Sequence, residues 1–491
     1  MSEHFDVCVI GAGPAGFAAA MRAHDLGKRV ALVERGRVGG AGMHHGALSS
    51  KTFWHLSNDY ARACRNDRGY ATSCVDVHYK DVRAEVARAV HEREAIFSRQ
   101  LAELAAPDAR GSFVELVRGT ARFTAPKVVC VQTNTGERTL EADAFVLATG
   151  SSPRLPDGVP VDGVHVVTSD GIEDLETFPE SLLVVGAGVI GCEYATIFAN
   201  FGRTKVFVLD RQPRILPFED EDVAACIAEN FSRLGVTVHQ GAKLLDLAIR
   251  DGGVDYSVGY ADGRVVKNRV AKALVSTGRA PAVRGLGLEE LGVAFDKSGG
   301  IAVEDGQSTT TPWLWAVGDT TADVALANVA ELEGRHAIER IYGLASRPLR
   351  YEALSAIMFL QPEVASCGIN EQTARERKIA HRVGVVQNRL VARNVAMRAT
   401  EGFIKLVVSD EKPHQILGLR VVGPQASSAI AGVAFLVEKG GTLEDLDRLV
   451  HPHPAITEGV QECARLLLGH SVLKHAVFGE DLLTLRAWKP D

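Results

Sequence analysis

Short apolar runs that lead directly into glycine-rich turns are the main pattern of this chain. Phe5–Ile10 (FDVCVI) is such a run, and it predicts a buried strand that enters a turn and then an alanine-rich helix. Val30–Glu34 predicts the next strand. The same unit recurs at Leu182–Val185, which is followed by a second glycine turn and a strand at Lys205–Leu209. Two such units predict an α/β fold with two Rossmann-like domains.

Each of the two turns has the spacing of a dinucleotide-binding motif. Its glycines permit a tight turn and close approach of the backbone to a ligand, and the following helix presents its N-terminus to a pyrophosphate. An acidic residue at the end of the next strand accepts hydrogen bonds from a ribose. The residues are Gly11, Gly13, Gly16 and Glu34 in the first unit, and Gly186, Gly188, Gly191 and Asp210 in the second.

Length and charge add broad limits. The 491 residues indicate about three or four domains of ordinary size, and 54 basic against 61 acidic residues argue against a nucleic-acid surface. No apolar run approaches the roughly 18 residues of a membrane helix, and the N-terminus has no targeting pattern. We therefore expect a cytoplasmic enzyme. A polar stretch from about Tyr79 to Ala105 has the period of a helix.

Eight cysteines are scattered without a C-x-x-C pair. This spacing disfavours a structural zinc site or a disulfide framework, so we expect most of the cysteines to be reduced and buried.

The segment Gly39–Lys51, which reads GGAGMHHGALSSK, closely resembles the active-site helix of the flavoprotein disulfide reductases. The pattern of that family is GG-x-C-x4-C-x-x-S-K. The two cysteine positions are occupied here by Gly42 and Ala47. A thiolate is the nucleophile in disulfide exchange, and neither residue supplies one. The chain thus resembles a disulfide reductase, of the dihydrolipoamide dehydrogenase type, that lacks both redox-active cysteines.

Further motifs carry the resemblance from about residue 5 to residue 470. They are Ala148–Ser151, Ala316–Asp319, the Gly278-Arg279-x-Pro281 turn and the C-terminal HPHPAITEGVQECAR. The resemblance implies that the first glycine turn binds FAD and the second binds NAD(P)H. It implies FAD-site roles for Gly40, Lys51, Gly150 and Asp319, and an interdomain crossing at Gly278.

The same resemblance implies a C-terminal α+β dimerisation domain and a homodimer whose active site is shared across the interface. We expect a FAD-binding domain in two parts (1–150 and 281–349), a NAD(P)-binding domain (151–280), a dimerisation domain (350–470) and an unassigned C-terminal extension (471–491).

Residues near the second turn bear on the choice between NAD and NADP. Asp210 favours NAD, because a carboxylate pairs with a ribose 2′-hydroxyl and repels a 2′-phosphate. Arg211 and Arg214 favour a phosphate, unless they belong to a solvated loop. We expect NAD(H) in preference to NADP(H).

Four residues are candidates for catalysis. By the resemblance, Lys51 and Glu193 pair beside flavin N5, where hydride arrives; alternatively they are an ordinary surface lysine and helix glutamate. His453 and Glu458 match the His-Pro-x-x-x-Glu pattern in which the imidazole is a general acid or base toward the substrate. The other interpretation of His453 is a structural contact in the dimer.

His44 and His45 lie between the vacated cysteine positions. They either pack the pocket, bond to an organic acceptor, or join His451 and His453 as metal ligands; we expect no metal, since adjacent histidines point in different directions. The small residues at 42 and 47 predict open space beside the flavin. Ser49 replaces the usual proline and Asn328 a histidine.

The main hypothesis is a FAD-dependent NAD(P)H oxidoreductase that passes electrons from flavin to a small non-disulfide acceptor, either a quinone-like molecule or a second nicotinamide. Two alternatives remain open at this point. One is a non-catalytic FAD- or NAD-binding sensor or complex subunit. The other is a true dihydrolipoamide dehydrogenase in which a cysteine such as Cys64 or Cys74 replaces the relay.

Overall fold

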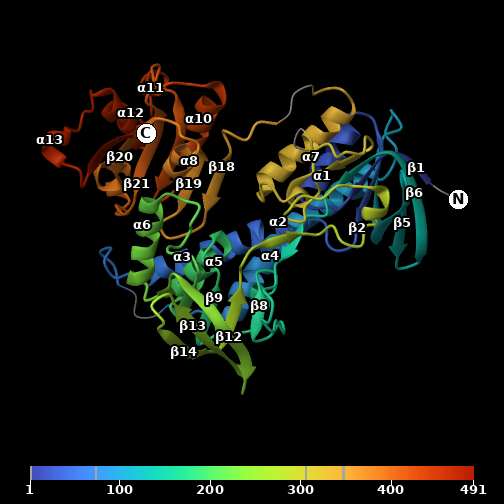
Figure 1. The fold of residues 1–491 in the computed structure, drawn as a ribbon, viewed down its shortest axis with the longest axis horizontal. Coiled ribbons are helices and arrows are strands. Elements are labelled where there is room, and N and C mark those ends of the chain that lie inside the picture. Colours follow the sequence, from blue (N-terminus) through green and yellow to red (C-terminus); the bar gives the residue numbers. More distant parts are fainter. Residues whose placement is uncertain (1–2, 72–74, 305–306, 346–348, 491) are drawn as a thin grey trace. The chain divides into compact units, whose positions relative to one another are not determined.

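The computed structural model describes residues 3–71, 75–304, 307–345 and 349–490 (Figure 1). The chain forms two compact units, each assembled from separate segments. The first unit comprises Met1–Glu180, Asp246–Asp255 and Arg269–Leu349, and the second comprises Ser181–Leu245, Tyr256–Asn268 and Arg350–Asp491. The domain boundaries expected at residues 150, 280, 349 and 470 stay predictions.

The first unit is built on a mainly parallel sheet with the strand order β3-β2-β1-β6-β5-β4, in which β17 also pairs with β6. Val7 of β1 lies between Val30 of β2 and Ala144 of β6, and all three are buried. Helices cover such sheets, so their strands are continuous apolar runs. The two strands predicted here are confirmed. The strands are β1 (Glu3–Ile10), β2 (Arg29–Glu34), β3 (Phe113–Arg118), β4 (Thr120–Ala125), β5 (Val128–Thr133), β6 (Gly136–Leu147) and β17 (Leu314–Ala316).

The helices of the first unit pack closely. A Cβ built on Gly334 of α7 would lie 2.1 Å from the carbonyl oxygen of Ala15 in α1, so this approach requires glycine. In α4, Val82, Val86 and Val90 are buried on one face, and the helix predicted from the period of this polar stretch is confirmed. The helices are α1 (Pro14–Asp25), α2 (Gly40–His44), α3 (Ala47–Ala63), α4 (Tyr79–Leu104) and α7 (Ala327–Ile341).

Short elements complete this unit. Strand β7 (Ser151–Pro153) pairs antiparallel with β16 (Arg279–Pro281), and β8 (Val166–Thr168) pairs parallel with β15 (Lys272–Val275). The 3-10 turns are η1 (Ile172–Asp174), η2 (Glu289–Leu291) and η3 (Gly318–Thr321).

The second unit begins with the repeat of the strand–turn–helix pattern. Strands β9 (Ser181–Val185), β10 (Lys205–Leu209) and β11 (Thr237–His239) are parallel neighbours, which confirms the strands predicted at 182–185 and 205–209. The helices of this part are α5 (Val189–Phe201) and α6 (Glu221–Arg233). Next come β12 (Ala242–Arg250), β13 (Gly253–Tyr260) and β14 (Val265–Val270), whose residues are divided between the two units.

The C-terminal part of the second unit is an antiparallel sheet covered by helices, with the strand order β18-β19-β22-β21-β20-β23. Its core joins the sheet to α10 and α12 through residues such as Ile404, Val421, Ile430 and Val460. The strands are β18 (Ser355–Met358), β19 (Val364–Gly368), β20 (His381–Gln387), β21 (Phe403–Ser409), β22 (Ile416–Val422) and β23 (Leu483–Trp488). The helices are α8 (Glu371–Glu376), α9 (Ala392–Ala396), α10 (Ala426–Lys439), α11 (Leu443–Asp447), α12 (Thr457–Leu468) and α13 (His475–Phe478), and η4 is Asn388–Leu390.

The C-terminal extension, which the sequence left unassigned, contributes the last strand of this sheet. In β23, Leu483 pairs with Val386 and is fully buried, and Trp488 stacks on His381 with ring centroids 5.5 Å apart. The extension is thus an integral part of the C-terminal sheet.

Candidate active site

The first glycine turn is closed at its ends and open in its middle. A Cβ on Gly11, whose φ is +104°, would lie 2.2 Å from the Ala148 carbonyl oxygen, and one on Gly16 would lie 1.8 Å from the Gly11 carbonyl oxygen. In contrast, a Cβ on Gly13 would have no neighbour within 4 Å. Because α1 begins at the next residue, the open side of Gly13 lies at a helix N-terminus, as a pyrophosphate site requires.

Glu34 closes the turn from the end of β2. Its Oε2 accepts a 2.7 Å hydrogen bond from the amide of Ala12, and its Oε1 accepts one of 2.7 Å from the amide of Gly36. Each carboxylate oxygen has a second lone pair, so Glu34 retains the capacity to accept from a ribose hydroxyl.

Asp319 is held in place by a chain of polar contacts. Its Oδ2 accepts a 2.5 Å hydrogen bond from the Ser151 hydroxyl, which also accepts one of 2.8 Å from Arg279 Nε. The neighbouring amide of Gly318 donates to Glu333 Oε2 at 2.6 Å. Glu333 lies in a stretch whose Ala-Glu-x-Glu-Gly pattern marks it in the sequence, although its bond to Gly318 does not follow from that pattern.

The surroundings of Asp319 leave a polar atom for a ligand. The buried Thr149 hydroxyl has no hydrogen-bond partner among the described residues, and a Cβ on Gly150, whose φ is +69°, would meet nothing within 4 Å. A buried polar atom without a partner is costly, so it points to a group that is bound there. The first glycine turn with Glu34, together with Thr149, Gly150 and Asp319, is called the FAD cradle below. These residues fit a bound FAD.

The segment expected to form one active-site helix is broken in two. Helix α2 ends at His44, α3 begins at Ala47, and Gly46 between them has φ −164° and ψ −88°. Gly40 lies against the first glycine turn, because a Cβ on it would lie 3.0 Å from the Cα of Gly13. The segment thus borders the FAD cradle.

The expectation of open space at position 42 is wrong. A Cβ built on Gly42 would lie 2.6 Å from Cγ of Pro14, well inside the ordinary carbon contact distance of about 3.5–4.0 Å. The proline ring occupies the space that a side chain would need. Pro14 is visible in the sequence as the proline at the start of α1. That it lies next to position 42 follows only from the tertiary structure.

His44 and His45 have different environments. His44 is buried and its Nε2 lies 2.8 Å from the Val38 carbonyl oxygen, while His45 is exposed. Burial lowers the pKa of His44, so its ring is neutral near pH 7. The two ring centroids are 6.3 Å apart. Within the residues that the structure describes, no group of three or more His, Cys, Asp or Glu side chains forms a candidate metal site.

Lys51 lies in the second turn of α3. Its Nζ donates to the Ser50 hydroxyl at 3.2 Å, and that hydroxyl donates to the Gly46 carbonyl oxygen. The adjacent Ser49, which replaces the usual proline, is buried and its hydroxyl has no partner in the described part of the chain. The break at Gly46 therefore positions the start of α3 and with it Lys51.

The second glycine turn repeats the geometry of the first. Gly186 has φ +105°, a Cβ on Gly188 would meet nothing within 4 Å, and α5, which contains Gly191, begins at the next residue. Asp210 Oδ2 accepts from the amide of Ala187 at 2.7 Å, and Oδ1 accepts from the amide of Gln212 at 2.8 Å. This turn is likewise suited to a dinucleotide.

The two arginines after Asp210 differ. Arg211 is exposed. The Nη2 of Arg214 donates to the carbonyl oxygens of Pro217 at 3.1 Å and Glu219 at 2.7 Å, and to Oε1 of Gln372 at 2.5 Å. The solvated-loop interpretation is therefore wrong for Arg214. Gln372 carried no signal in the sequence, because it is 158 positions away.

Glu193 is buried in α5, only 4% exposed, and its Oε1 accepts a 2.9 Å hydrogen bond from the amide of Phe359. A buried carboxylate is retained only where partners satisfy it. Its pairing with Lys51 stays a prediction.

His453 and Glu458 are together. His453 Nδ1 lies 2.8 Å from Glu458 Oε1, and Glu458 Oε2 accepts from the amide of Ala455 at 2.8 Å. Burial raises the pKa of Glu458, but the bonds from His453 and Ala455 outweigh it and leave this pKa below its usual value. Glu458 is therefore ionised and orients an imidazole that is 73% exposed. His451 is more buried, and its Nε2 has no partner among the residues described.

The cysteines do not gather at this site. Cys8, Cys192, Cys367 and Cys463 are buried, and burial raises the pKa of each thiol. Cys64 is exposed and follows the last residue of α3. With a rise of 1.5 Å per residue, it lies about 20 Å from Lys51 along the helix. Cys74 lies outside the described residues.

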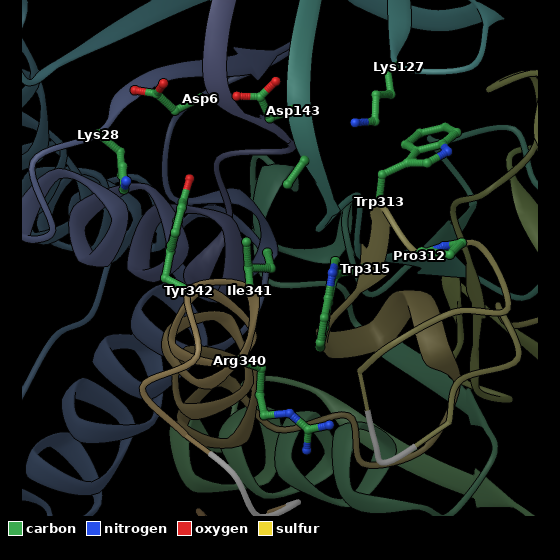
Figure 2. A pocket seen from close by; sticks show the side chains of 11 residues that line it. Asp6, Lys28, Lys127, Asp143, Pro312, Trp313, Trp315, Arg340, Ile341 and Tyr342 are labelled. Atoms are coloured by element: carbon green, nitrogen blue, oxygen red, sulfur yellow. The ribbon is translucent and has the colours of Figure 1, made fainter.

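A surface pocket of about 480 Å³ is lined by residues of the first unit, and none of the candidate site residues lines it (Figure 2). Two of its charged groups have partners: Asp6 is paired with Arg29, and Lys28 Nζ lies 4.2 Å from the ring centroid of Tyr342. Open α/β sheets bind ligands at the carboxyl ends of their strands, so we do not place the active site here. The lining residues are Asp6, Lys28, Lys127, Asp143, Ala144, Pro312, Trp313, Trp315, Arg340, Ile341 and Tyr342.

Comparison with known proteins agrees with this geometry. Residues 5–334 match the family described as pyridine nucleotide-disulphide oxidoreductase, and residues 354–464 match the dimerisation domain of that family. The chain is 34% identical over 475 residues to dihydrolipoyl dehydrogenase 3 of Pseudomonas aeruginosa, covering 96% of this chain and 100% of that protein.

A second relative and a solved structure extend the comparison. Dihydrolipoyl dehydrogenase of Geobacillus stearothermophilus is 34% identical over 94% of this chain and 96% of its own length. The crystal structure of LpdA from Mycobacterium tuberculosis aligns with a TM-score of 0.86 at 26% identity, over 95% of this chain and 99% of the other. The mixed α/β fold with nucleotide-binding and dimerisation domains is thereby confirmed. Among the described residues, none of the helices combines the length and the apolar character that a membrane span requires.

Proposed function

The chain belongs to the pyridine nucleotide-disulphide oxidoreductase family, and on that premise we propose that it transfers electrons from NAD(P)H through FAD directly to a non-disulfide acceptor. The observation that carries this proposal is the loss of sulfur at Gly42 and Ala47 beside a retained Lys51. Disulfide exchange requires a thiolate, which these positions do not supply. Pro14 supports the proposal, since it fills the space of a side chain at position 42.

The donor we propose is NADH. Asp210 stands at the ribose position of the second turn, where its negative charge would repel a 2′-phosphate. Arg214, a half-buried cation of the following loop, is bonded to two carbonyl oxygens and to Gln372. It is thus engaged elsewhere, which favours NAD over NADP.

In the step that transfers hydride from the nicotinamide to FAD, Lys51 and Glu193 would act as an ion pair. When bound, FAD would accept the reducing equivalents of the nicotinamide and release them to the acceptor. An ammonium at Lys51 would stabilise negative charge that develops on the reduced ring. Glu193, which accepts a hydrogen bond from the Phe359 amide, would keep that ammonium charged and oriented.

On the acceptor side, His453 would supply a proton and Glu458 would orient its imidazole. The dimerisation domain supports a homodimer in which this pair completes the site of the partner subunit. An acceptor that gains both electrons and protons suits this arrangement, and a quinone-like molecule is of this class. A second nicotinamide is the other acceptor we consider.

The alternatives have less support. A non-catalytic FAD- or NAD-binding subunit would keep both glycine turns but would have no need of a hydride-transfer pair at Lys51 and Glu193. A dihydrolipoyl dehydrogenase with another relay needs a thiol beside the flavin, and Cys64 is about 20 Å along α3 from Lys51.

Anaerobic stopped-flow spectroscopy tests the proposal. Mixing with NADH should bleach the flavin without the red-shifted band that a thiolate stacked on the ring produces, and quinones or a nicotinamide analogue should restore the flavin spectrum. Dihydrolipoamide and glutathione disulfide should turn over negligibly. A thiolate band, or thiol-dependent turnover that survives Cys64→Ser and Cys74→Ser, would contradict the proposal. Flavin that NADH does not bleach would favour a binding subunit.

A further inference from the structure

The loop of residues 211–220, which follows Asp210, is hydrogen-bonded at its end to the start of α8. Asn370 Nδ2 donates to the Phe218 carbonyl oxygen at 2.9 Å. The amides of Glu371 and Gln372 donate to the two carboxylate oxygens of Asp220 at 3.2 and 3.0 Å. The end of the loop of residues 211–220 is thus held by a segment that is 151 to 152 positions away in the sequence.

A buried charge cluster fixes the same end of the loop. Lys405 is fully buried, and its Nζ lies 2.7 Å from Asp220, 2.9 Å from Asp222 and 2.6 Å from Glu371. Arg486 of β23 contacts Asp222 at 2.8 Å and also pairs with Glu371. Buried charges retain their geometry because separation from their partners is expensive. The loop therefore has little freedom at residues 219–222.

The guanidinium group of Arg214 is hydrogen-bonded to the end of its own loop and to Gln372 of α8. Its Nη2 has three acceptors among the described residues: two backbone carbonyl oxygens and the side-chain Oε1 of Gln372 at 2.5 Å. Gln372 is itself fixed, because its backbone N–H donates to Asp220 and its side-chain Nε2 donates to Glu376 at 3.1 Å. Gln372 is thus a preset acceptor for the guanidinium group.

Arg214 is nevertheless within reach of the nucleotide. It follows Asp210 by four residues, a separation of at most about 14 Å even in a fully extended chain. A guanidinium group is also the side chain best suited to a phosphate, which it binds with two parallel hydrogen bonds. The position of this one cation therefore bears on whether the 2′-phosphate of NADP finds a partner.

We infer that Gln372 of the dimerisation domain is a specificity-determining residue that holds Arg214 away from the ribose of the bound nicotinamide nucleotide. Gln372 acts only through Arg214 and touches no substrate, so it is a positioning residue. Without it, Arg214 turns toward the 2′-phosphate and offsets the repulsion from Asp210. This inference rests on the NADH preference proposed above.

The test measures dissociation constants of NAD⁺ and NADP⁺ for the FAD-loaded protein by calorimetry, together with the rates of flavin reduction by NADH and NADPH. Gln372→Met keeps the size of the side chain and removes the acceptor. It should tighten NADP⁺ binding about tenfold, as expected for one charge-assisted hydrogen bond, and change NAD⁺ binding less than about twofold. Gln372→Glu keeps an acceptor and should leave both constants unchanged.

Matched variants separate this role from a structural one. Gln372→Met/Arg214→Met should lose the gain in NADP⁺ binding, and Glu376→Gln should not produce it. Arg214→Met alone should leave the ratio of the two constants unchanged, since Arg214 is already withheld. Far-ultraviolet circular dichroism and FAD content establish whether each variant is folded. If Gln372→Met does not fold, Gln372→Ala replaces it as the variant that lacks the acceptor.

Three results would overturn the inference: an unchanged ratio in folded Gln372→Met, a gain that persists without Arg214, or weaker NADP⁺ binding in Arg214→Met alone. In each of these, normal flavin reduction by NADH would leave the proposed function intact. A wild-type protein that binds neither dinucleotide would overturn both.

Discussion

The ring of Pro14 occupies the space that a side chain at Gly42 would need, with 2.6 Å between Pro14 Cγ and a Cβ built on Gly42. This contact joins the start of α1 to α2. A side chain at position 42 would therefore require one of these two segments to move.

Restoring both cysteines should therefore not restore a disulfide reductase. We expect Gly42→Cys/Ala47→Cys to show less than about one hundredth of the dihydrolipoamide activity of a dihydrolipoyl dehydrogenase, because α2 must first move away from Pro14. The measurement is dihydrolipoamide oxidation together with free-thiol titration. Adding Pro14→Ala, which removes the obstructing ring, is the control and should raise the yield of the disulfide. High activity in the double variant alone would show that α2 adapts freely.

Lys51→Met should slow the reduction of flavin by NADH at least about tenfold, because the site loses a positive charge near the ring that is worth a few kcal/mol in a low-dielectric environment. Lys51→Arg keeps the charge and should be less affected. Both are measured by anaerobic stopped-flow absorbance on protein with full FAD content. Equal rates in Lys51→Met and wild type would remove Lys51 from the mechanism.

His453→Gln should leave reduction by NADH nearly unchanged and slow reoxidation by a proton-requiring acceptor about 100-fold, the range of a lost general acid. Glu458→Gln should have a smaller effect on the same step, since it orients the imidazole without transferring the proton. One-electron dyes, which need no proton, are the control. A uniform loss with all acceptors, accompanied by dissociation of a dimer in sedimentation, would make His453 an interface residue instead.

Lys405→Met should lower the free energy of unfolding by about 3–5 kcal/mol, because Asp220, Asp222 and Glu371 lose their shared buried cation. The matched control is Lys489→Met. Lys489 also pairs with an aspartate, Asp410 at 2.9 Å, but its side chain is 70% exposed and solvent screens the pair, so the loss should be much smaller than that of Lys405→Met. Chemical denaturation monitored by circular dichroism measures both, and similar losses would contradict the expected role of burial.

The same cluster predicts a dependence of stability on pH. Burial raises the pKa of Glu371, but the hydrogen bond from Arg486 and the charge of Lys405 outweigh it and lower this pKa to about 2. Folding therefore favours the ionised form, and this stabilisation is present above the unfolded pKa of about 4.3 and is lost as the pH falls toward 2. Glu371→Gln should flatten the decline between pH 5 and about pH 2 in denaturation experiments. An equally steep decline in the variant would assign it to other carboxylates.

Local features of the sequence were sufficient to identify both nucleotide-binding units. In each, an apolar strand, a glycine turn and an acidic residue stand close together along the chain. Glu34 and Asp210 accordingly make the same two bonds to backbone amides in their respective turns. The His453–Glu458 pair is equally local, because five residues and one helix start bring the two side chains together.

The sequence by itself determined the fold class, the two glycine turns and the absence of sulfur at positions 42 and 47, since these depend on residue type and short-range geometry. Only the tertiary structure decided that Pro14 closes position 42, that Gln372 holds Arg214, and that the last strand extends the C-terminal sheet. The reason is physical. Each of these contacts joins residues that no hydrophobic period or motif relates, and a contact of this kind forms only once the chain has packed.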